Sequence, residues 1–138
     1  MSPDEIREFL TTGTRTAKVA TVRADGRPHV APVWFILDGD DVIFNTGEST
    51  LKGKTLRRDP RIALCVDDDQ PPYAFVLVTG EASLSTDPDE LVRSATRIGA
   101  RYMGDDRGEE FGRRNAVPGE LVVRVTPTSV VAEKDLAD

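Results

Sequence analysis

Two Asp-Gly pairs, Asp25-Gly26 and Asp38-Gly39, lie between short runs of β-branched and aromatic residues in the first third of this chain. Asp-Gly suits the positive φ angles of a two-residue hairpin turn, and flanking β-formers make it a strong local signal for antiparallel pairing. Two such turns in succession limit this part of the chain to strands that run back and forth. We therefore expect a three-stranded antiparallel meander over about residues 15–47.

Three further strands are predicted downstream. Segment 61–66, RIALCV, is apolar on both faces, which is typical of a strand covered on both sides. Segment 72–84 predicts a long strand with a bulge or bend at Gly80, and segment 120–131 predicts the last strand. The buried face of that last strand should consist of Leu121, Val123 and Val125.

Capping residues delimit two helices. Ser2 can cap a short helix over residues 3–10, and Thr86 can cap a longer helix that ends at Gly104. Residues 105–119 lack a helical pattern and are expected to form a loop with at most one helical turn. The apolar face of the longer helix should consist of Leu91, Ala95, Ile98 and Tyr102.

Six strands and two or three helices predict an α+β fold that is mainly β, a small antiparallel β-barrel. At 138 residues the chain is most simply a single domain, residues 1–138. A net charge of −6 and a pI near 4.8 argue against a general nucleic-acid or membrane-surface binder, because both partners are polyanionic. No apolar run reaches the ~20 residues that span a bilayer, and the N-terminal residues do not resemble a signal peptide, so we expect a cytoplasmic protein.

The sequence offers few residues for catalysis by side chains alone. The single cysteine, Cys65, excludes an internal disulfide and should be an inert part of an apolar strand. With one cysteine and one histidine, a structural zinc site within the chain is not expected. His29 could act as a base, but an exposed or edge histidine is the more common explanation, and the acids 67–69 are expected to be a solvated loop rather than a metal cluster.

Segment 49–64, STLKGKTLRRDPRIAL, concentrates positive charge in this acidic chain. A helix is expected over Leu51–Arg58 and must end at Asp59, because the residue before a proline is disfavoured in helical geometry. At about 100° per residue, the side of this helix that faces the barrel should consist of Leu51, Thr55 and Leu56. The opposite side, which carries Lys54 and Arg57, should be solvated.

Lys52 is the exception among these cations. It points near the direction of Leu56, toward the barrel, yet it lies in the first helical turn, where the helix dipole disfavours a cation. An anion at the helix N-terminus, held by backbone N–H groups and the Ser49 or Thr50 hydroxyl, would remove this conflict. A phosphate site is one interpretation, and a basic surface helix that pairs with nearby acids is the other.

The motif S-x-x-K-x-x-x-L-x-x-D-P-x-x-x-L, from Ser49 to Leu64, follows the strands that contain APVWF and VIFNTG. In this order the chain resembles, over essentially its whole length, the pyridoxamine 5′-phosphate oxidase-like split-barrel family, and most of all its short deazaflavin-dependent reductases. The resemblance implies a six-stranded antiparallel split β-barrel of Greek-key type with two to three helices. It also implies a homodimer that binds FMN or the deazaflavin coenzyme F420 at the subunit interface.

The cofactor-binding residues that the resemblance implies fall into three groups and one separate residue, Tyr73. Those expected near the phosphate are Asn45, Thr46, Ser49, Thr50 and Lys52. Those expected along the ring, mostly through backbone groups, are Ala31, Pro32, Val33 and Trp34. Lys54 and Arg57 could meet the anionic oligoglutamate tail of F420, and Tyr73 could reach the partner subunit's site.

Two of these residues also have purely structural interpretations. Pro32 cannot donate a ladder hydrogen bond, so its strand should be an edge or an interrupted pairing. Protection of that edge would by itself explain the proline. Trp34 could simply be buried core.

Departures from the family pattern narrow the expected function. The vitamin B6 oxidases carry an arginine-led motif where this chain has HVAPVWF, and this chain ends soon after its last predicted strand, so vitamin B6 oxidation is not expected. The dense cations instead favour an F420-dependent oxidoreductase that transfers a hydride from the reduced cofactor to a small conjugated acceptor. An FMN-dependent oxidase or reductase, and a flavin- or deazaflavin-binding protein without turnover, are the alternatives.

Overall fold

The computed structural model describes residues 1–138, which form seven strands, four α-helices and one 3-10 helix. The strands are β1 (Ala17–Val22), β2 (Pro28–Val33), β3 (Ile36–Asp38), β4 (Asp41–Gly47), β5 (Arg61–Asp68), β6 (Ala74–Ser85) and β7 (Glu120–Glu133). The helices are α1 (Pro3–Thr11), α2 (Leu51–Arg58), α3 (Pro88–Met103), η1 (Asp105–Arg107) and α4 (Gly108–Asn115). None of the helices combines the length and the apolar character that crossing a membrane requires.

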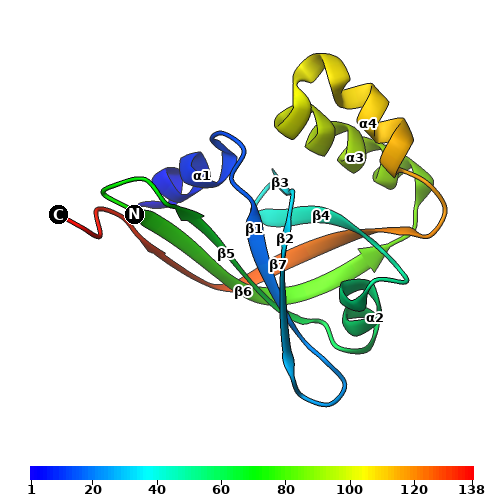
Figure 1. Ribbon diagram of the computed structural model, residues 1–138, viewed down its shortest axis with the longest axis horizontal. Helices are drawn as coiled ribbons and strands as arrows, with labels where there is room; N and C mark the ends of the chain where they lie inside the picture. Colours follow the sequence, from blue (N-terminus) through cyan, green and yellow to red (C-terminus); the bar gives the residue numbers. More distant parts are fainter.

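All seven strands belong to one antiparallel sheet in the order β2-β1-β5-β6-β7-β4-β3. The edge strands are therefore β2 and β3, yet only Trp34 and Phe35 separate them along the chain. Because three residue steps reach about 11 Å at most, the sheet must curl until its two edges approach each other at this linker (Figure 1). No ladder joins β2 to β3, so the barrel stays open along one line, which we call the split.

The main core is a cluster of 15 buried residues on the inner face of the curled sheet. Helix α2 packs against β1, β4 and β6 and adds Leu56 to this core. Helices α3 and α4 pack against each other beyond the sheet (Figure 1). A second, smaller cluster fixes α3 to the sheet, where Leu91 and Ile98 pack with Ile43 and Val122. The two clusters hold α2 and α3 at different places along the same sheet.

The strand pairing corrects the predicted meander. β1 pairs with β2 and β3 pairs with β4, with the two turn glycines at positive φ, Gly26 at 87° and Gly39 at 61°. However, β2 does not pair with β3, so the three-stranded meander and the count of six strands were wrong. Local turn chemistry specifies each hairpin, whereas the β1–β5 and β4–β7 ladders decide where each hairpin joins the sheet.

Residues 105–115 form η1 and α4, so the predicted loop was wrong. The sequence pattern that would indicate α4 is weak, because Phe111 is the only large side chain that this helix buries. Glycines of both helices permit close packing: a Cβ on Gly112 of α4 would lie 2.1 Å from Thr96 Oγ1, and a Cβ on Gly99 of α3 would lie 2.5 Å from Phe111 Cβ. Glycines that look like helix breakers in the sequence are thus what allows this helix pair to form.

Most predicted boundaries are confirmed. Ser2 caps α1 in a capping box, Gly104 ends α3 at a φ of 108°, and the β6 register shifts between Thr79 and Gly80. Helix α3 is capped by Asp87 rather than by Thr86, because the Asp87 carboxylate accepts the Asp89 N–H.

One face of β5 departs from the prediction. Ile62, Leu64 and Val66 are buried on the inner face, but Ala63 and Cys65 on the outer face are only half-buried. The chain therefore covers one face of this strand and not both. Cys65 lies outside the core, and partial burial raises the pKa of its thiol, which keeps it protonated.

Candidate cofactor site

Two unpaired strand edges border the split. β2 pairs only with β1, so its other edge carries free backbone groups. β3 pairs with residues 41–43 of β4, which leaves residues 44–47 paired on one side only, with β7. The free N–H and C=O groups of these two edges can bind a ligand that enters the split.

Helix α2 starts directly after β4, at the same end of the split. The Thr50 hydroxyl caps it by accepting the Gly53 N–H at 3.1 Å and donating to the Gly47 carbonyl at 2.8 Å. A Cβ on Gly53 would lie 2.3 Å from the Gly47 carbonyl oxygen, so this close contact requires glycine. The N–H groups of Leu51 and Lys52 have no acceptor within the chain and remain available to a ligand.

The two hydroxyls that were predicted to bind the phosphate, those of Ser49 and Thr50, are not equivalent. Thr50 Oγ1 is engaged by Gly47 and Gly53 and also lies 3.0 Å from the hydroxyl of buried Thr46. Ser49 is exposed and has no hydrogen-bond partner within the chain. The Ser49 hydroxyl is therefore the one that is free to donate to an anion.

Three of the five cations in residues 52–61 have a partner within the chain. Arg57 binds Glu48 at 2.9 Å, Arg58 donates to the Val22 carbonyl at 2.7 Å, and Arg61 binds Asp59 at 2.7 Å. The guanidinium of Arg61 lowers the pKa of Asp59 to about 2. Only two members of the segment have no ion pair or hydrogen bond within the chain, and these are half-buried Lys52 and exposed Lys54.

The predicted faces of α2 are largely correct. Thr55 and Leu56 are buried, and Lys54 and Arg57 are exposed, as expected. Leu51 is 37% exposed, so its predicted place against the barrel was wrong. The first turn of α2 lies where the barrel is split, and Leu51 therefore has little to pack against.

Of the two strand residues expected near the phosphate, Thr46 contacts the start of α2 through Thr50, whereas Asn45 points to the opposite face of β4, toward α3. Thr46 is buried, and the half-buried Asn45 donates from Nδ2 to the Ser94 hydroxyl at 3.0 Å. Ser94 of α3, which fixes the Asn45 side chain, was not predicted from the sequence. The two residues are 49 positions apart, and no local pattern could have indicated the pair.

The predicted ring-binding strand is β2. Ala31 and Val33 lie on its half-buried side, whereas Pro32 is exposed. Because β2 is a sheet edge, the prediction that Pro32 marks an edge strand is confirmed. Small apolar side chains and an unpaired edge give a surface against which a flat ring can lie.

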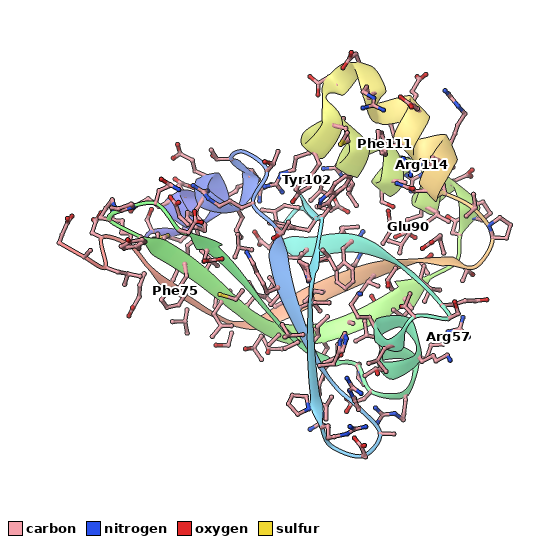
Figure 2. The ribbon with its side chains drawn as sticks, viewed as in Figure 1. Arg57, Phe75, Glu90, Tyr102, Phe111 and Arg114 are labelled. Carbon is pink, nitrogen blue, oxygen red and sulfur yellow. The ribbon has the colours of Figure 1, made fainter.

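Trp34, at the end of this strand, belongs to an aromatic stack. It is 38% exposed, so it is not buried core. Its ring lies parallel to that of Tyr102, 4.9 Å away, and 6.4 Å from Phe111. The Tyr102 hydroxyl accepts the Phe35 N–H at 3.2 Å and donates to the Arg15 carbonyl at 2.8 Å. Tyr102, which Figure 2 shows between α3 and the strands, thus holds the β2–β3 linker in place.

Tyr73 is not brought to this site within the chain. It is 42% exposed and precedes β6, whose 12 residues extend about 40 Å at about 3.3 Å per residue. Phe75, two residues beyond Tyr73, and Arg57 of α2 lie at opposite ends of the molecule (Figure 2). Any role for Tyr73 at a site of this kind requires a second copy of the chain.

The other candidate catalytic residues form no reactive set. His29 is half-buried on the edge strand β2. Asp67 and Asp68 point to opposite faces of β5, where they pair with Lys18 at 2.9 Å and Arg15 at 3.3 Å. No three His, Cys, Asp or Glu side chains form a group that could hold a metal ion. Side chains at the split can bind and orient a ligand, but they form no triad or metal centre.

The donors at the start of α2 suit a phosphate group. They comprise the free N–H groups of Leu51 and Lys52, the Ser49 hydroxyl, and the ammonium groups of Lys52 and Lys54. Backbone N–H groups at a helix N-terminus together with cations are a common phosphate-binding arrangement. Together with the edge of β2, these residues fit a cofactor that carries both a phosphate and a flat ring.

Solved structures of other proteins share this fold. A conserved hypothetical protein from Mycobacterium tuberculosis is 25% identical, with 100% of this chain and 89% of that chain covered and a TM-score of 0.87. An F420 reductase is also 25% identical, with 90% and 94% covered and a TM-score of 0.70. A putative pyridoxamine 5′-phosphate oxidase from Listeria innocua, at 24% identity with 98% of each chain covered and a TM-score of 0.74, shows the fold alone.

A family model described as pyridoxamine 5′-phosphate oxidase matches residues 2–133. This match runs from the cap of α1 to the end of β7. The chain therefore belongs to the pyridoxamine 5′-phosphate oxidase-like split-barrel family, whose members bind flavins or deazaflavins.

Proposed function

We propose that this protein is a homodimeric oxidoreductase whose single split-barrel domain binds coenzyme F420, and that it transfers a hydride from the reduced cofactor to a small conjugated acceptor. Family membership and the similarity to an F420 reductase support this proposal. The observation that carries it is the pair of unpartnered lysines, Lys52 and Lys54, in the first half of α2.

The lack of a partner for these two lysines needs an explanation, because acidic residues outnumber basic ones in this chain. It contains 24 Asp and Glu against 18 Lys and Arg, yet none of these acids pairs with Lys52 or Lys54. The start of a helix is also the least favourable place for an unpaired cation. An anionic ligand at this helix end would compensate both charges.

Each binding residue then has a distinct task. Lys52, Ser49 and the free N–H groups of α2 bind the phosphate, while Asn45 and Thr46 shape its edge of the split. Lys54 is better placed than Arg57 to meet an anionic tail, because Arg57 already binds Glu48. Backbone groups of residues 31–34 orient the ring, and the bound deazaflavin supplies the hydride.

The outer face of the sheet supports a dimer. Val131 of β7 is 46% exposed and shares the outer face with the half-buried Cys65 of β5, because both residues pair with Leu77. A second copy that covers this face would bury apolar area and bring Tyr73 toward the other subunit's site. Light scattering at micromolar concentration should show a dimer, and a 15.1 kDa monomer that binds cofactor would contradict this part of the proposal.

Titration with F420 and with FMN, at low and high salt, tests the choice of cofactor. F420 should bind more tightly, and its advantage should shrink as salt rises, because exposed cations that meet an anionic tail are screened. FMN is the second candidate, since the donors at α2 suit any phosphate monoester. Equal or tighter FMN binding at low salt would favour FMN, and a protein that binds F420 without reducing any conjugated acceptor would be a binding protein only.

A further inference from the structure

Three buried side-chain atoms have no hydrogen-bond partner in this chain: Thr21 Oγ1, Arg23 Nε and His29 Nδ1. They are the only such nitrogen or oxygen atoms, and all three belong to the β1–β2 hairpin. Buried polar groups in folded proteins are nearly always hydrogen-bonded. Their occurrence together in one hairpin indicates a common partner that the chain itself does not supply.

The register of the hairpin places these groups on one face. Thr21 and His29 are directly opposite each other in the β1–β2 ladder, and such partners have Cβ atoms about 4.5–5.5 Å apart. Thr21 is only 2% exposed and shares the inward face of β1 with buried Val19. Arg23 follows two residues after Thr21 and continues the same side. We call these three residues the hairpin cluster.

Two arginines that form no ion pair lie at the hairpin cluster, Arg23 within it and Arg58 beside it. Arg23 has no carboxylate partner, and the nearby Asp25 binds Arg27 at 2.7 Å instead. From α2, Arg58 donates to the Val22 carbonyl at 2.7 Å and has no carboxylate partner either. Two guanidinium groups thus lie at the junction of the hairpin and α2, which Figure 1 shows side by side in the lower part of the molecule.

We propose that the hairpin cluster is an anion subsite that takes a carboxylate or phosphate group and is separate from the start of α2. Arg23 Nε–H and the Thr21 hydroxyl donate to the anion, and His29 donates from Nδ1–H. Helix α2 has eight residues and is about 12 Å long. Since the hairpin cluster lies toward its C-terminal end, near Arg58, the two ends of α2 can hold two anionic groups of one ligand. The subsite does not depend on which cofactor the protein uses.

The test measures anion binding by calorimetry and by thermal unfolding, with inorganic phosphate and with acetate as probes at constant ionic strength. All variants carry Lys52→Ala, so that the start of α2 contributes little. Arg23→Gln should raise the Kd of the preferred probe about tenfold or more, and Thr21→Val should raise it several-fold. The matched control is Arg27→Gln, a guanidinium of the same hairpin that Asp25 already pairs, and it should leave the Kd unchanged.

Thr21→Val gives a second, independent readout. It exchanges an unpaired buried hydroxyl for a methyl group of the same shape, so without anion the midpoint of unfolding should stay the same or rise. A variant that unfolds later but binds anions more weakly identifies the hydroxyl as a ligand group. A fall in the midpoint without anion would show that the hydroxyl is already satisfied, and would overturn the proposal.

The remaining outcomes separate this subsite from the proposed phosphate site. If Lys52→Ala alone abolishes all anion binding, the start of α2 binds the anion and the subsite is wrong. If neither probe binds, or if Arg23→Gln and Arg27→Gln behave alike, the hairpin cluster is satisfied by water and the proposal fails. A preference for phosphate over acetate, or the reverse, identifies the chemical group that the subsite takes.

Discussion

Helices α2 and α3 both carry many cations, but they use them in opposite ways. On α3, Arg97 donates to the Leu37 carbonyl at 2.9 Å. Arg101 donates at 2.7–3.0 Å to three carbonyls, those of Leu10, Gly13 and Phe35. On α2, by contrast, Lys52 and Lys54 have no partner within the chain. Arg97 and Arg101 of α3 therefore hold the fold together, whereas Lys52 and Lys54 of α2 are available to a ligand.

Burial explains why the two helices differ. Arg101 lies between α3 and the β2–β3 linker, over the rings of Phe35 at 4.6 Å and Tyr102 at 5.0 Å. Partial burial lowers the pKa of its guanidinium, but the group remains a cation because arginine side chains stay protonated in proteins. Three backbone carbonyls, one at the end of α1 and two in loops, accept hydrogen bonds from this one side chain. The number of cations in a segment therefore does not reveal whether they stabilise the fold or are free to bind a ligand.

Arg101→Ala should give the largest effect on stability. Three charged hydrogen bonds, each worth about 1.5–3 kcal/mol and not additive, are lost together. We expect the free energy of unfolding to fall by about 3–4 kcal/mol, measured by urea denaturation. Arg93→Ala, which removes an exposed arginine of the same helix without such contacts, should change it by less than about 0.5 kcal/mol. Equal effects of the two variants would contradict the structural role of Arg101.

Lys52→Ala should affect binding and not folding. We expect cofactor binding to weaken by about 1.5–3 kcal/mol, the usual contribution of a hydrogen bond to a charged group. The free energy of unfolding without cofactor should stay the same or rise slightly, because an unfavourable interaction with the helix dipole is removed.

Matched variants on the same helix complete this test. Lys54→Ala and Arg57→Ala should each weaken binding by less than half as much, since both side chains are exposed. Cofactor titration and thermal unfolding of all three variants provide the data. Normal binding by Lys52→Ala together with weak binding by Arg57→Ala would mean that the phosphate lies elsewhere on α2.

Tyr102→Phe should give a smaller loss of stability, about 1–2 kcal/mol. The variant keeps the ring that stacks on Trp34 but leaves the Phe35 N–H and the Arg15 carbonyl without their hydroxyl partner. Because Trp34 is the only tryptophan, its fluorescence reports directly on the stack and should change little. A large spectral shift would show that the hydroxyl, and not ring packing, holds Trp34.

Glu120→Gln should give the smallest effect, one that depends on pH. Burial raises the pKa of Glu120 above its ordinary value of 4.5, so the folded state binds this proton more tightly than the unfolded state. Its stabilising contribution is complete below pH 4.5 and is lost as pH rises through the folded-state pKa. The variant should therefore gain stability relative to the parent between pH 4 and 7, as seen in thermal unfolding. A constant difference across this range would exclude the titration of Glu120 as the cause.

Several features follow from neighbours in the sequence and could be predicted from it. The end of α2 at Asp59 follows from Pro60, the cap of α1 follows from Ser2, and the two hairpin turns follow from their Asp-Gly pairs. The segment from Ser49 to Leu64 also indicates the family from local sequence alone. These signals depend on residues a few positions apart, whose interactions persist in any surrounding fold.

Only the tertiary structure decided which groups meet over long separations. Strand order placed the two predicted hairpins at opposite edges of one sheet, and α4 formed because three glycines allow it to approach α3. Ser94 reached Asn45 across 49 positions, and Arg58 reached the Val22 carbonyl across 36. Whether a cation is satisfied depends on such distant partners, and their approach is set by how the whole sheet curls rather than by residues beside them in the chain.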